Sequence, residues 1–270
     1  MASTEHTSDW VAGEVVNSTG RAPLVLVCEH AANAIPTGYG TLGCTKADLR
    51  RHIAIDVGAA DLSRGLAKAL DAPAVLCSTS RLFVDCNRYP FDSEWMPSTA
   101  DGSSVPANVD LSAQEKQRRC ELVFEPFHAM VADVVADKRR QTPPPTLIAI
   151  HSYATSMNGV PRLPSAVIWE EEEPARQVIA AMRALAADVG DNWPYDGRIH
   201  RGYTFGRHAI PYGLSHFAIE VRQDLLVTEA GIYSWVRLLA SAFATVLAEK
   251  AGRSPSRLSR TRVRVTSCRR

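Results

Sequence analysis

The sequence predicts an α/β fold, a three-layer sandwich around a central mixed, largely parallel β-sheet. Short apolar runs typical of buried strands recur along the chain, and segments with helical periodicity separate several of them. No internal repeat and no linker divides the 270 residues. Strands that alternate with helices favour one largely parallel sheet with helices packed on it.

The predicted strands are the six apolar runs at residues 24–27, 74–76, 82–84, 147–150, 166–169 and 216–221. Each run is short, and each is rich in Val, Ile, Leu, Phe or Ala. Nearly continuous apolar runs of this kind are typical of strands that are buried on both faces.

Periodicity and composition predict helices over residues 45–70, 112–140, 174–189 and 229–250. The second helix opens with a capping box, from Ser112 to Glu115, and Pro126 is expected to kink it or split it in two. We expect the third helix to end at Gly190. It is also expected to carry the acidic run 170–173 in its first turn, where carboxylates suit the helix dipole.

Composition and charge exclude several classes of protein. Thirty Lys and Arg residues balance 29 Asp and Glu residues, which disfavours a nucleic-acid partner because phosphate contacts need an excess of positive charge. No run of about 18 apolar residues is present to span a membrane, and the N-terminus has no secretory signal. The six cysteines match no zinc-ribbon spacing. We therefore expect a cytoplasmic protein with no membrane partner.

The chain is expected to form one α/β domain, residues 1–252, followed by a basic tail, residues 253–270. Residues 251–270 contain seven Arg and no acidic residue, and they lack apolar periodicity. Such a segment is typical of a disordered extension. The sequence leaves the oligomeric state open.

Polar residues stand at or near the ends of three predicted strands. Glu29 and His30 follow the first strand, His151 follows the run 147–150, and Glu220 lies in the last strand. In open α/β sheets, ligands bind beyond the carboxyl ends of the strands. Two His and a carboxylate there suit Zn²⁺ with one position open for water, and a further carboxylate can take the proton of that water. One strand-end His alone is more often a structural residue, so it is the pair that favours a metal site.

Two further positions carry charge in otherwise apolar surroundings. Asp56 interrupts an apolar helical face, and a buried carboxylate requires a partner, either a metal ion or an arginine. Arg88 clusters with Arg81, Asp85 and Asn87 at the end of a predicted strand. A guanidinium group binds carboxylates with two hydrogen bonds, so Arg88 is a candidate for binding an acidic substrate. The simpler interpretation of this cluster is a structural Asp–Arg pair.

Motifs of several other enzyme classes are absent. The chain contains no HExxH, which carries the metal of many zinc proteases, and no GxSxG, which carries the nucleophile of many serine hydrolases. The phosphate-binding motif GxxxxGK[ST] is also absent. These absences leave a strand-borne metal site as the best-supported chemistry.

Five runs, in this order, resemble the N-formylglutamate amidohydrolase family: CEHAANAIP, HIAIDVGAADL, SRLFVDCNRYP, LIAIHSYA and FAIEVRQDL. The resemblance covers roughly residues 20–250. This family resembles the zinc carboxypeptidases, which have a phosphorylase/hydrolase-like fold. In those enzymes a metal-binding His begins a His-Ser-Tyr run, as His151 does, and the catalytic Glu begins a Glu-x-Arg run, as Glu220 does. An Asn-Arg pair holds the substrate carboxylate there, and Asn87 and Arg88 are similar.

The resemblance implies a zinc-dependent amidohydrolase that cleaves an N-acyl amino acid, with N-formyl-L-glutamate giving formate and glutamate in histidine degradation. The partner would be a small anionic N-acyl amino acid, and the cofactor one divalent ion, Zn²⁺. His30, Asp56 and His151 would hold the ion, and Glu220 would be the catalytic base. The residues that would bind the substrate carboxylates are Asn87, Arg88 and Arg222.

One position departs from the carboxypeptidase pattern. That pattern has His-x-x-Glu, whereas here Asn33 stands three residues after His30. The second protein ligand must therefore be a carboxylate from elsewhere. Asp56 is the first choice and Glu29 the second, because adjacent side chains on a strand point to opposite faces.

Two other functions fit the same pattern, a zinc carboxypeptidase-like peptidase and a catalytically silent binding protein on the same fold. A peptidase needs an open groove, whereas a closed pocket with two arginines favours a small diacid. The presence of Glu220 together with both His residues argues against a silent protein. The segments 89–110 and 201–208 are expected to be loops, the first a candidate lid and the second placed over the site.

Overall fold

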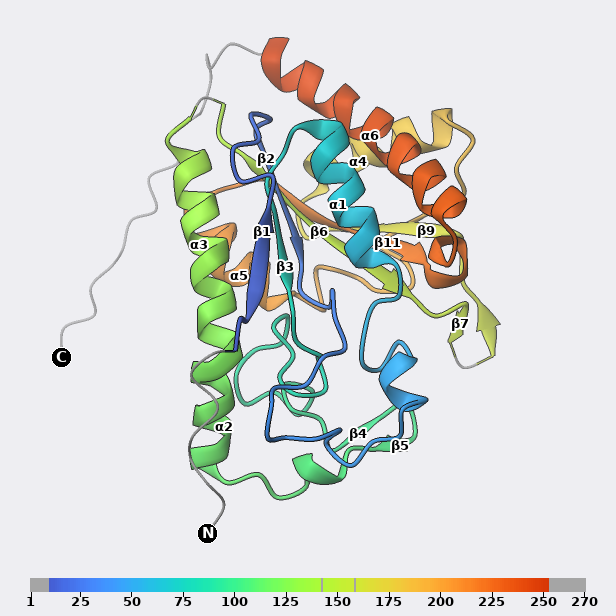
Figure 1. Ribbon diagram of the computed structural model, residues 1–270. Coiled ribbons are helices and arrows are strands. Elements are labelled where there is room, and N and C mark those ends of the chain that lie inside the picture. Colours follow the sequence, from blue (N-terminus) through green and yellow to red (C-terminus); the bar gives the residue numbers. More distant parts are fainter. Residues whose placement is uncertain (1–9, 142, 158, 253–270) are drawn as a thin grey trace, which may run out of the picture.

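The strands that carry the candidate site belong to one mixed sheet. The computed structural model describes residues 10–141, 143–157 and 159–252 (Figure 1). Seven strands of this part of the chain form the sheet: β1 (Gly13–Val16), β2 (Leu24–Cys28), β3 (Ala74–Cys77), β6 (Thr146–Tyr153), β9 (Ser165–Ile168), β10 (Val189–Asp191) and β11 (His216–Arg222). Their order across it is β1–β3–β2–β6–β11–β9–β10. The central strands β3, β2, β6 and β11 are parallel, whereas β1 and β9 run antiparallel to β3 and β11. The predicted α/β class with a largely parallel sheet is confirmed.

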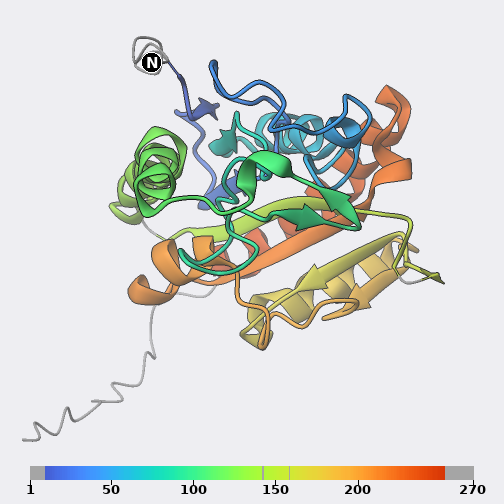
Figure 2. The ribbon, with the colours of Figure 1, turned by 90° about the horizontal axis from the view of Figure 1, so that it is seen from below.

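Helices cover both faces of this sheet, which gives the three layers (Figures 1 and 2). One face carries α1 (Ala59–Leu70), α4 (Glu172–Ala184) and α6 (Glu229–Gly252). The other face carries α3 (Glu125–Arg139) and α5 (Tyr203–His208), and α2 (Ala113–Arg119) extends α3 at its N-terminal end. None of the helices described here is both long and apolar enough to cross a membrane.

Strand β2 shows why the apolar runs predicted strands. Its residues are all buried, and they alternate between two hydrophobic cores. Leu24 and Leu26 pack in the core beneath α1, whereas Val25 and Val27 pack in the core beneath α3. A strand with helices on both faces needs apolar side chains at every position, so it lacks the polar alternation of a half-exposed strand.

Two short strand pairs lie outside the sheet, β4 (Thr99–Ala100) with β5 (Ser103–Ser104), and β7 (Ser156–Met157) with β8 (Val160–Pro161). The β4–β5 pair lies within the predicted loop 89–110 and stands in front of the sheet in Figure 2. The predicted tail, residues 253–270, lies outside the described residues.

The helix predicted over residues 45–70 is wrong in its first half. Residues 45–58 form turns and one 3₁₀ turn, Asp48–Arg50, and α1 begins only at Ala59. Gly58 precedes it with a φ of 77°, and a Cβ atom there would lie 2.4 Å from the Cβ of Leu226. The backbone thus turns sharply before α1, and Asp56 lies in a loop, where its N–H donates to the carbonyl of His30 (3.0 Å). Asp56 is therefore held beside the end of β2 instead of on a helix face.

The strand predicted at residues 82–84 is also wrong, since these residues form turns. Their apolar side chains are buried against α3, but their carbonyls bond to side chains instead of a neighbouring strand. Asn108 donates to the Leu82 carbonyl (2.7 Å), and Arg119 donates to the Phe83 carbonyl (3.1 Å). Buried turns of this kind satisfy backbone groups with distant polar side chains, which no local pattern reveals.

The other helix boundaries divide into correct and incorrect predictions. Pro126 does split its helix: α2 and α3 are separated by a π-helical turn, Cys120–Phe124. Gly190 does not end a helix, because α4 ends at Ala184 and Gly190 lies in β10. Glu170 is not in the first turn of α4 but stands before it, beside the cavity described below.

Candidate active site

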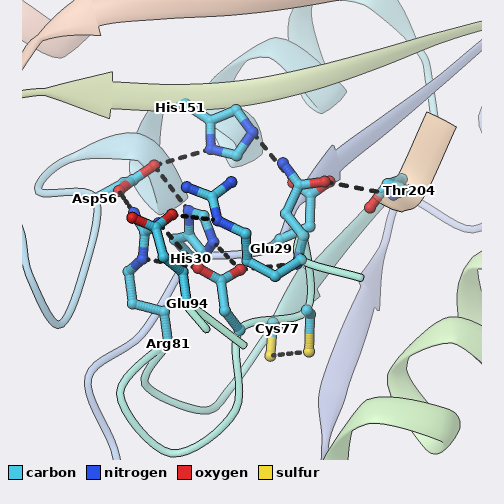
Figure 3. A network of polar contacts seen from close by, with 12 residues as sticks. Glu29, His30, Asp56, Cys77, Arg81, Glu94, His151 and Thr204 are labelled. Atoms are coloured by element: carbon cyan, nitrogen blue, oxygen red, sulfur yellow. Dashed lines mark hydrogen bonds and ion pairs between the residues drawn. The ribbon is translucent and has the colours of Figure 1, made fainter. Parts of the chain in front are cut away.

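Three side chains that were predicted as metal ligands converge in the structure. His30 follows β2 and His151 lies on β6, and these neighbouring parallel strands end at the same edge of the sheet. Nδ1 of His30 lies 3.3 Å from Oδ2 of Asp56, and Nδ1 of His151 lies 2.9 Å from the same oxygen (Figure 3). One potential ligand atom from each residue lies within 4.8 Å of the other two. We call these three buried residues the imidazole–carboxylate cluster.

The far nitrogens of both imidazoles face other carboxylates. Nε2 of His30 lies 2.8 Å from Oδ1 of Asp85, and Nε2 of His151 lies 3.5 Å from Oε2 of Glu29. A carboxylate in this position fixes the orientation and tautomer of a metal-binding imidazole. Of the two carboxylates left open by the sequence, Asp56 thus faces both Nδ1 atoms, while Glu29 lies behind His151.

Arg81 compensates part of the buried negative charge. Its guanidinium lies 2.9 Å from Asp85 and 3.5 Å from Oδ1 of Asp56, so the Asp–Arg structural pair considered from the sequence is present. Burial opposes ionisation of Asp85, but the neighbouring His30 and Arg81 hold the pKa of its carboxyl far below the usual value. Asp85 is therefore a carboxylate across the physiological pH range.

The charges around the cluster fit a bound cation. Burial alone would lower the pKa of His151, but the neighbouring Glu29, Asp56 and Glu220 carboxylates raise it to about 9. Both carboxylate oxygens of Glu29 and Oε2 of Glu220 are buried without a hydrogen-bond partner in the described part of the chain. Buried carboxylates with unpaired oxygens are costly unless a positive charge lies near them. The donor set of two imidazoles and a carboxylate is one that Zn²⁺ accepts.

Glu220 stands beside the cluster. It lies on β11 directly across from His151 on β6, and it lines the same cavity as the cluster. Burial and the nearby charge of Asp56 raise the pKa of the Glu220 carboxyl to about 7, although His151 acts in the opposite direction. A carboxyl group with a pKa near neutrality can both accept and donate a proton, which is the requirement for a general acid and base.

The cluster lies in a cavity of about 750 Å³. Polar side chains, including Arg81, Asn87 and Arg88, form part of its wall. An apolar part of the wall is formed by Ile168, Trp169, Phe205 and Ala218. A cavity of this volume is within the range of small-molecule sites, and its many polar and charged side chains suit a polar, charged ligand.

The predicted substrate-binding residues are only partly brought together. Asn87 and Arg88 line the cavity, and Nε of Arg88 donates to Glu94 (2.8 Å) at the rim. Arg222 does not line it. The Arg222 guanidinium is bound by Asp224 (2.7 Å) and by the carbonyl of Arg162 (3.1 Å), which hold it away from the cavity. The structure therefore gives no support to Arg222 as a substrate ligand.

The segment 201–208 lies at the cavity as predicted, but it is not a loop throughout. Residues 203–208 form helix α5, because Asn87 accepts hydrogen bonds from the first N–H groups: its carbonyl from Tyr203 (3.2 Å) and its Oδ1 from Thr204 (3.3 Å). Gly202 and Phe205 line the cavity beside them. The capping residue is more than a hundred positions away in sequence, so the sequence around α5 carries no signal of it.

The sequence assigns no functional role to several cavity residues, among them His52, Glu170 and Arg201, although it places the segment of Arg201 over the site. Nδ1 of His52 lies 3.2 Å from Oδ1 of Asp56, and burial lowers the pKa of this imidazole to about 4. Glu170 and Arg201 also line the cavity, as an ion pair. Both stand in segments rich in charge, where their residue types are unremarkable, so only the three-dimensional arrangement identifies them.

Known proteins resemble this chain in sequence and fold. A family model described as N-formylglutamate amidohydrolase matches residues 22–227. The structure of gene product Atu2144 from Agrobacterium tumefaciens is similar with 30% identity and a TM-score of 0.83, over 88% of this chain and 96% of that one. The N-formylglutamate amidohydrolase from Ralstonia eutropha JMP134 has a similar fold, with 17% identity and a TM-score of 0.68 over 90% of this chain and 99% of that one. No curated protein matches the chain.

Proposed function

The chain belongs to the N-formylglutamate amidohydrolase family, and from this premise we propose that it hydrolyses the amide bond of an N-acyl amino acid in a metal-dependent reaction. The preferred substrate in this proposal is N-formyl-L-glutamate, which gives formate and glutamate. One observation carries the proposal: two imidazoles and the Asp56 carboxylate converge on one point, with Glu220 beside them in the same cavity.

His30, Asp56 and His151 would hold the metal ion, with Zn²⁺ as the first candidate. Oε2 of Glu220, which is buried without a hydrogen-bond partner among the described residues, supports a cation at this point. When bound, such an ion polarises the acyl carbonyl and makes water a nucleophile near neutral pH. Asp85 and Glu29 would keep the two imidazoles oriented with their Nδ1 atoms toward the ion.

Glu220 would move the proton. In this mechanism its carboxylate takes a proton from the attacking water as the water oxygen bonds to the formyl carbon. The same carboxyl then donates that proton to the amide nitrogen as the C–N bond breaks, which releases the amine of glutamate and formate. The group must be a base first and an acid second, and the burial that raises the pKa of the Glu220 carboxyl in the metal-free protein favours its protonation for the second step.

Asn87 and Arg88 would orient the substrate through its α-carboxylate. Both line the cavity on the segment that follows Asp85, so the substrate-binding and imidazole-orienting groups share one stretch of backbone. Oδ1 of Asn87 is occupied by the Thr204 N–H, which leaves its Nδ2 donors available for a ligand. Binding the carboxylate at a fixed point would place the acyl carbonyl against the cluster.

A second candidate is cleavage of a larger N-acyl amino acid or a short peptide. The cavity volume of about 750 Å³ favours it, because a formyl group fills little of such a space. The two candidates share the mechanism and differ in the acyl group. A comparison of kcat/KM for the N-formyl, N-acetyl and N-glycyl derivatives of L-glutamate would separate them.

The direct test is a metal analysis of the purified protein combined with an assay of formate release from N-formyl-L-glutamate. We expect close to one divalent ion per chain and activity that is lost with a chelator and restored by Zn²⁺. Protein that binds no metal under any condition, and that binds N-formyl-L-glutamate without cleaving it, would establish the silent binding protein instead.

A further inference from the structure

Three arginines line the cavity in the described part of the chain, and they differ in what else they bind. Arg81 is engaged by two buried carboxylates, as described above, and only 18% of its side chain is exposed. Arg88 and Arg201 have exposed fractions of 34% and 46%, and each has a single side-chain partner among the described residues. A guanidinium group has five N–H donors. Arg88 and Arg201 therefore have donors to offer a ligand, and we call them the rim arginines.

The segments that carry the rim arginines are joined at Asn87. This residue precedes Arg88, and it accepts the hydrogen bonds from Tyr203 and Thr204 that follow Arg201. A Cβ atom at Gly202 would lie 2.6 Å from Oδ1 of Asn87, so this close approach requires glycine. Two cationic residues from distant parts of the sequence thus belong to one rigid junction at the cavity.

Arg201 is held toward the cavity by Glu170. The two side chains form an ion pair, and Oε2 of Glu170 is buried without a hydrogen-bond partner among the described residues. Glu170 follows Trp169, whose N–H donates to Oδ1 of Asn192 (2.7 Å), and a Cβ atom at Gly197 would lie 2.6 Å from the Trp169 carbonyl oxygen. The backbone on which Glu170 stands is therefore fixed. With its backbone fixed, Glu170 orients the Arg201 guanidinium and leaves some of the N–H donors of that guanidinium free.

An apolar surface accompanies the rim arginines along the cavity. Ala218 stands two residues before Glu220 on β11, so both side chains leave the same face of the strand. Ile168 pairs with Ala218 on the adjacent strand β9, and Phe205 of α5 completes this surface. The methylene groups of an acidic side chain pack well on this apolar wall, whereas the carboxylate of that side chain needs the hydrogen-bond donors at the edge of the wall.

We propose that Arg201 binds the side-chain carboxylate of the substrate, while Arg88 binds its α-carboxylate, so that the pair selects N-acyl derivatives of acidic amino acids. This inference rests on the proposed function and names the residue that would give it specificity for glutamate. It also replaces Arg222, which the structure holds outside the cavity. Glu170 is a positioning residue in this arrangement.

The test compares two nearly isosteric substrates, N-formyl-L-glutamate and N-formyl-L-glutamine, in the wild-type enzyme and in Arg201→Gln. We expect the variant to lose roughly 10- to 100-fold in kcat/KM for the glutamate derivative, the range of a hydrogen bond between charged groups. The loss for the glutamine derivative should be much smaller. Arg88→Gln is the matched control, and it should weaken both substrates alike because both have the α-carboxylate.

A second variant separates binding from repulsion, since Arg201→Gln leaves Glu170 facing the substrate. The double variant Arg201→Gln with Glu170→Gln has no such charge, and the preference for glutamate should still be absent. Equal losses on both substrates in Arg201→Gln, or a preserved preference for glutamate, would overturn the assignment.

The inference and the proposed function can fail separately. If the wild-type protein cleaves neither these substrates nor the N-acetyl and N-glycyl derivatives of L-glutamate, the proposed function is wrong, and equilibrium binding of N-formyl-L-glutamate still tests Arg201. If Arg201→Gln weakens the binding of N-formyl-L-glutamate and leaves the binding of N-formyl-L-glutamine unchanged, the assignment is supported without catalysis. Binding of the glutamate derivative that is unaffected by the substitution, or absent from the wild-type protein, would refute it.

Discussion

His30 and His151 stand at the ends of neighbouring parallel strands, and both are almost fully buried. Arg88 and Arg201 stand on loops that line the same cavity, and a third to nearly a half of each side chain is exposed. The inner groups are paired with buried carboxylates, so removing one of them leaves an uncompensated charge. The rim pair of Arg88 with Glu94 is of the exposed kind that contributes about 0–1 kcal/mol. The inner end is thus suited to fixed chemistry, whereas at the rim Arg88 can exchange Glu94 for an acid of the substrate.

The largest expected effect comes from breaking the inner end with His151→Ala. The variant removes one imidazole of the cluster and the facing group of both Glu29 and Asp56. We expect the protein to lose its bound metal and its activity to fall below detection. Metal analysis and formate release measure both. His200→Ala, at the rim of the cavity, is the matched control and should retain the metal. Full metal content in His151→Ala would refute the assigned ligand set.

Glu220→Gln tests the proton transfer separately from metal binding, because it leaves the three proposed metal ligands in place. Glutamine has the shape of glutamate but cannot take a proton, so kcat should fall by roughly 10²- to 10⁴-fold, the range for general acid–base catalysis. Metal content and thermal stability should remain close to those of the wild-type protein. A kcat that stays within a few-fold of the wild-type value would mean that another group is the base.

The contrast between the two ends also explains what the sequence predicted. His30, His151 and Glu220 were identified because each stands in or at the end of a short apolar run, and strand ends in a parallel sheet meet at one edge. The apolar surroundings of Asp56 predict a buried carboxylate that needs a partner, and this holds although the helix expected around it is a loop. The need for a partner follows from burial and does not depend on the helix.

The rim could not be predicted in the same way. The local pattern places Glu170 in the first turn of a helix, and the family resemblance makes Arg222 a substrate ligand, but the structure places Glu170 before α4 and binds Arg222 to Asp224. The position of Arg201 depends on Gly202 meeting Asn87, a contact between segments more than a hundred residues apart. Close approaches of this kind between loops follow from tertiary packing and leave no periodic signal.

The third prediction concerns the pH dependence of metal binding at the inner end. In the metal-free protein the pKa of His151 is raised to about 9, so below that pH the imidazole carries a proton that a metal ion must displace. Apparent metal affinity should therefore fall on the order of tenfold for each pH unit just below about 9 and more steeply at lower pH, where His30, whose pKa is also raised, is protonated as well; it should level off above about 9. Competition with a chelating dye at several pH values measures the slope. Arg88→Ala, changed only at the rim, should show the same slope, and a flat profile would contradict the assignment.

A smaller effect is expected at the rim from Arg88→Ala. Loss of one charge-assisted contact should raise KM roughly 10- to 100-fold and change kcat far less, if the contact is equally strong in the ground and transition states. Steady-state kinetics on N-formyl-L-glutamate provide both constants. Arg222→Ala is the matched control, because this arginine lies outside the cavity and its loss should leave KM unchanged. An unchanged KM in Arg88→Ala would remove Arg88 from substrate binding.

The smallest expected effect is also the sharpest test of the contrast between the inner end and the rim, because here a substitution is expected to lower KM. Glu94 binds Arg88 in the free protein, and 66% of the Glu94 side chain is exposed, so a substrate carboxylate must replace this pair. Glu94→Gln weakens the competing interaction while Arg88 is retained, and KM should fall by roughly two- to fivefold, the value of an exposed ion pair. The gain should shrink as salt is added, since salt screens exposed charges and weakens the pair in the wild-type protein too. If KM rises instead, Glu94 orients Arg88 for the substrate and does not compete with it, and the rim would then be as fixed as the inner end.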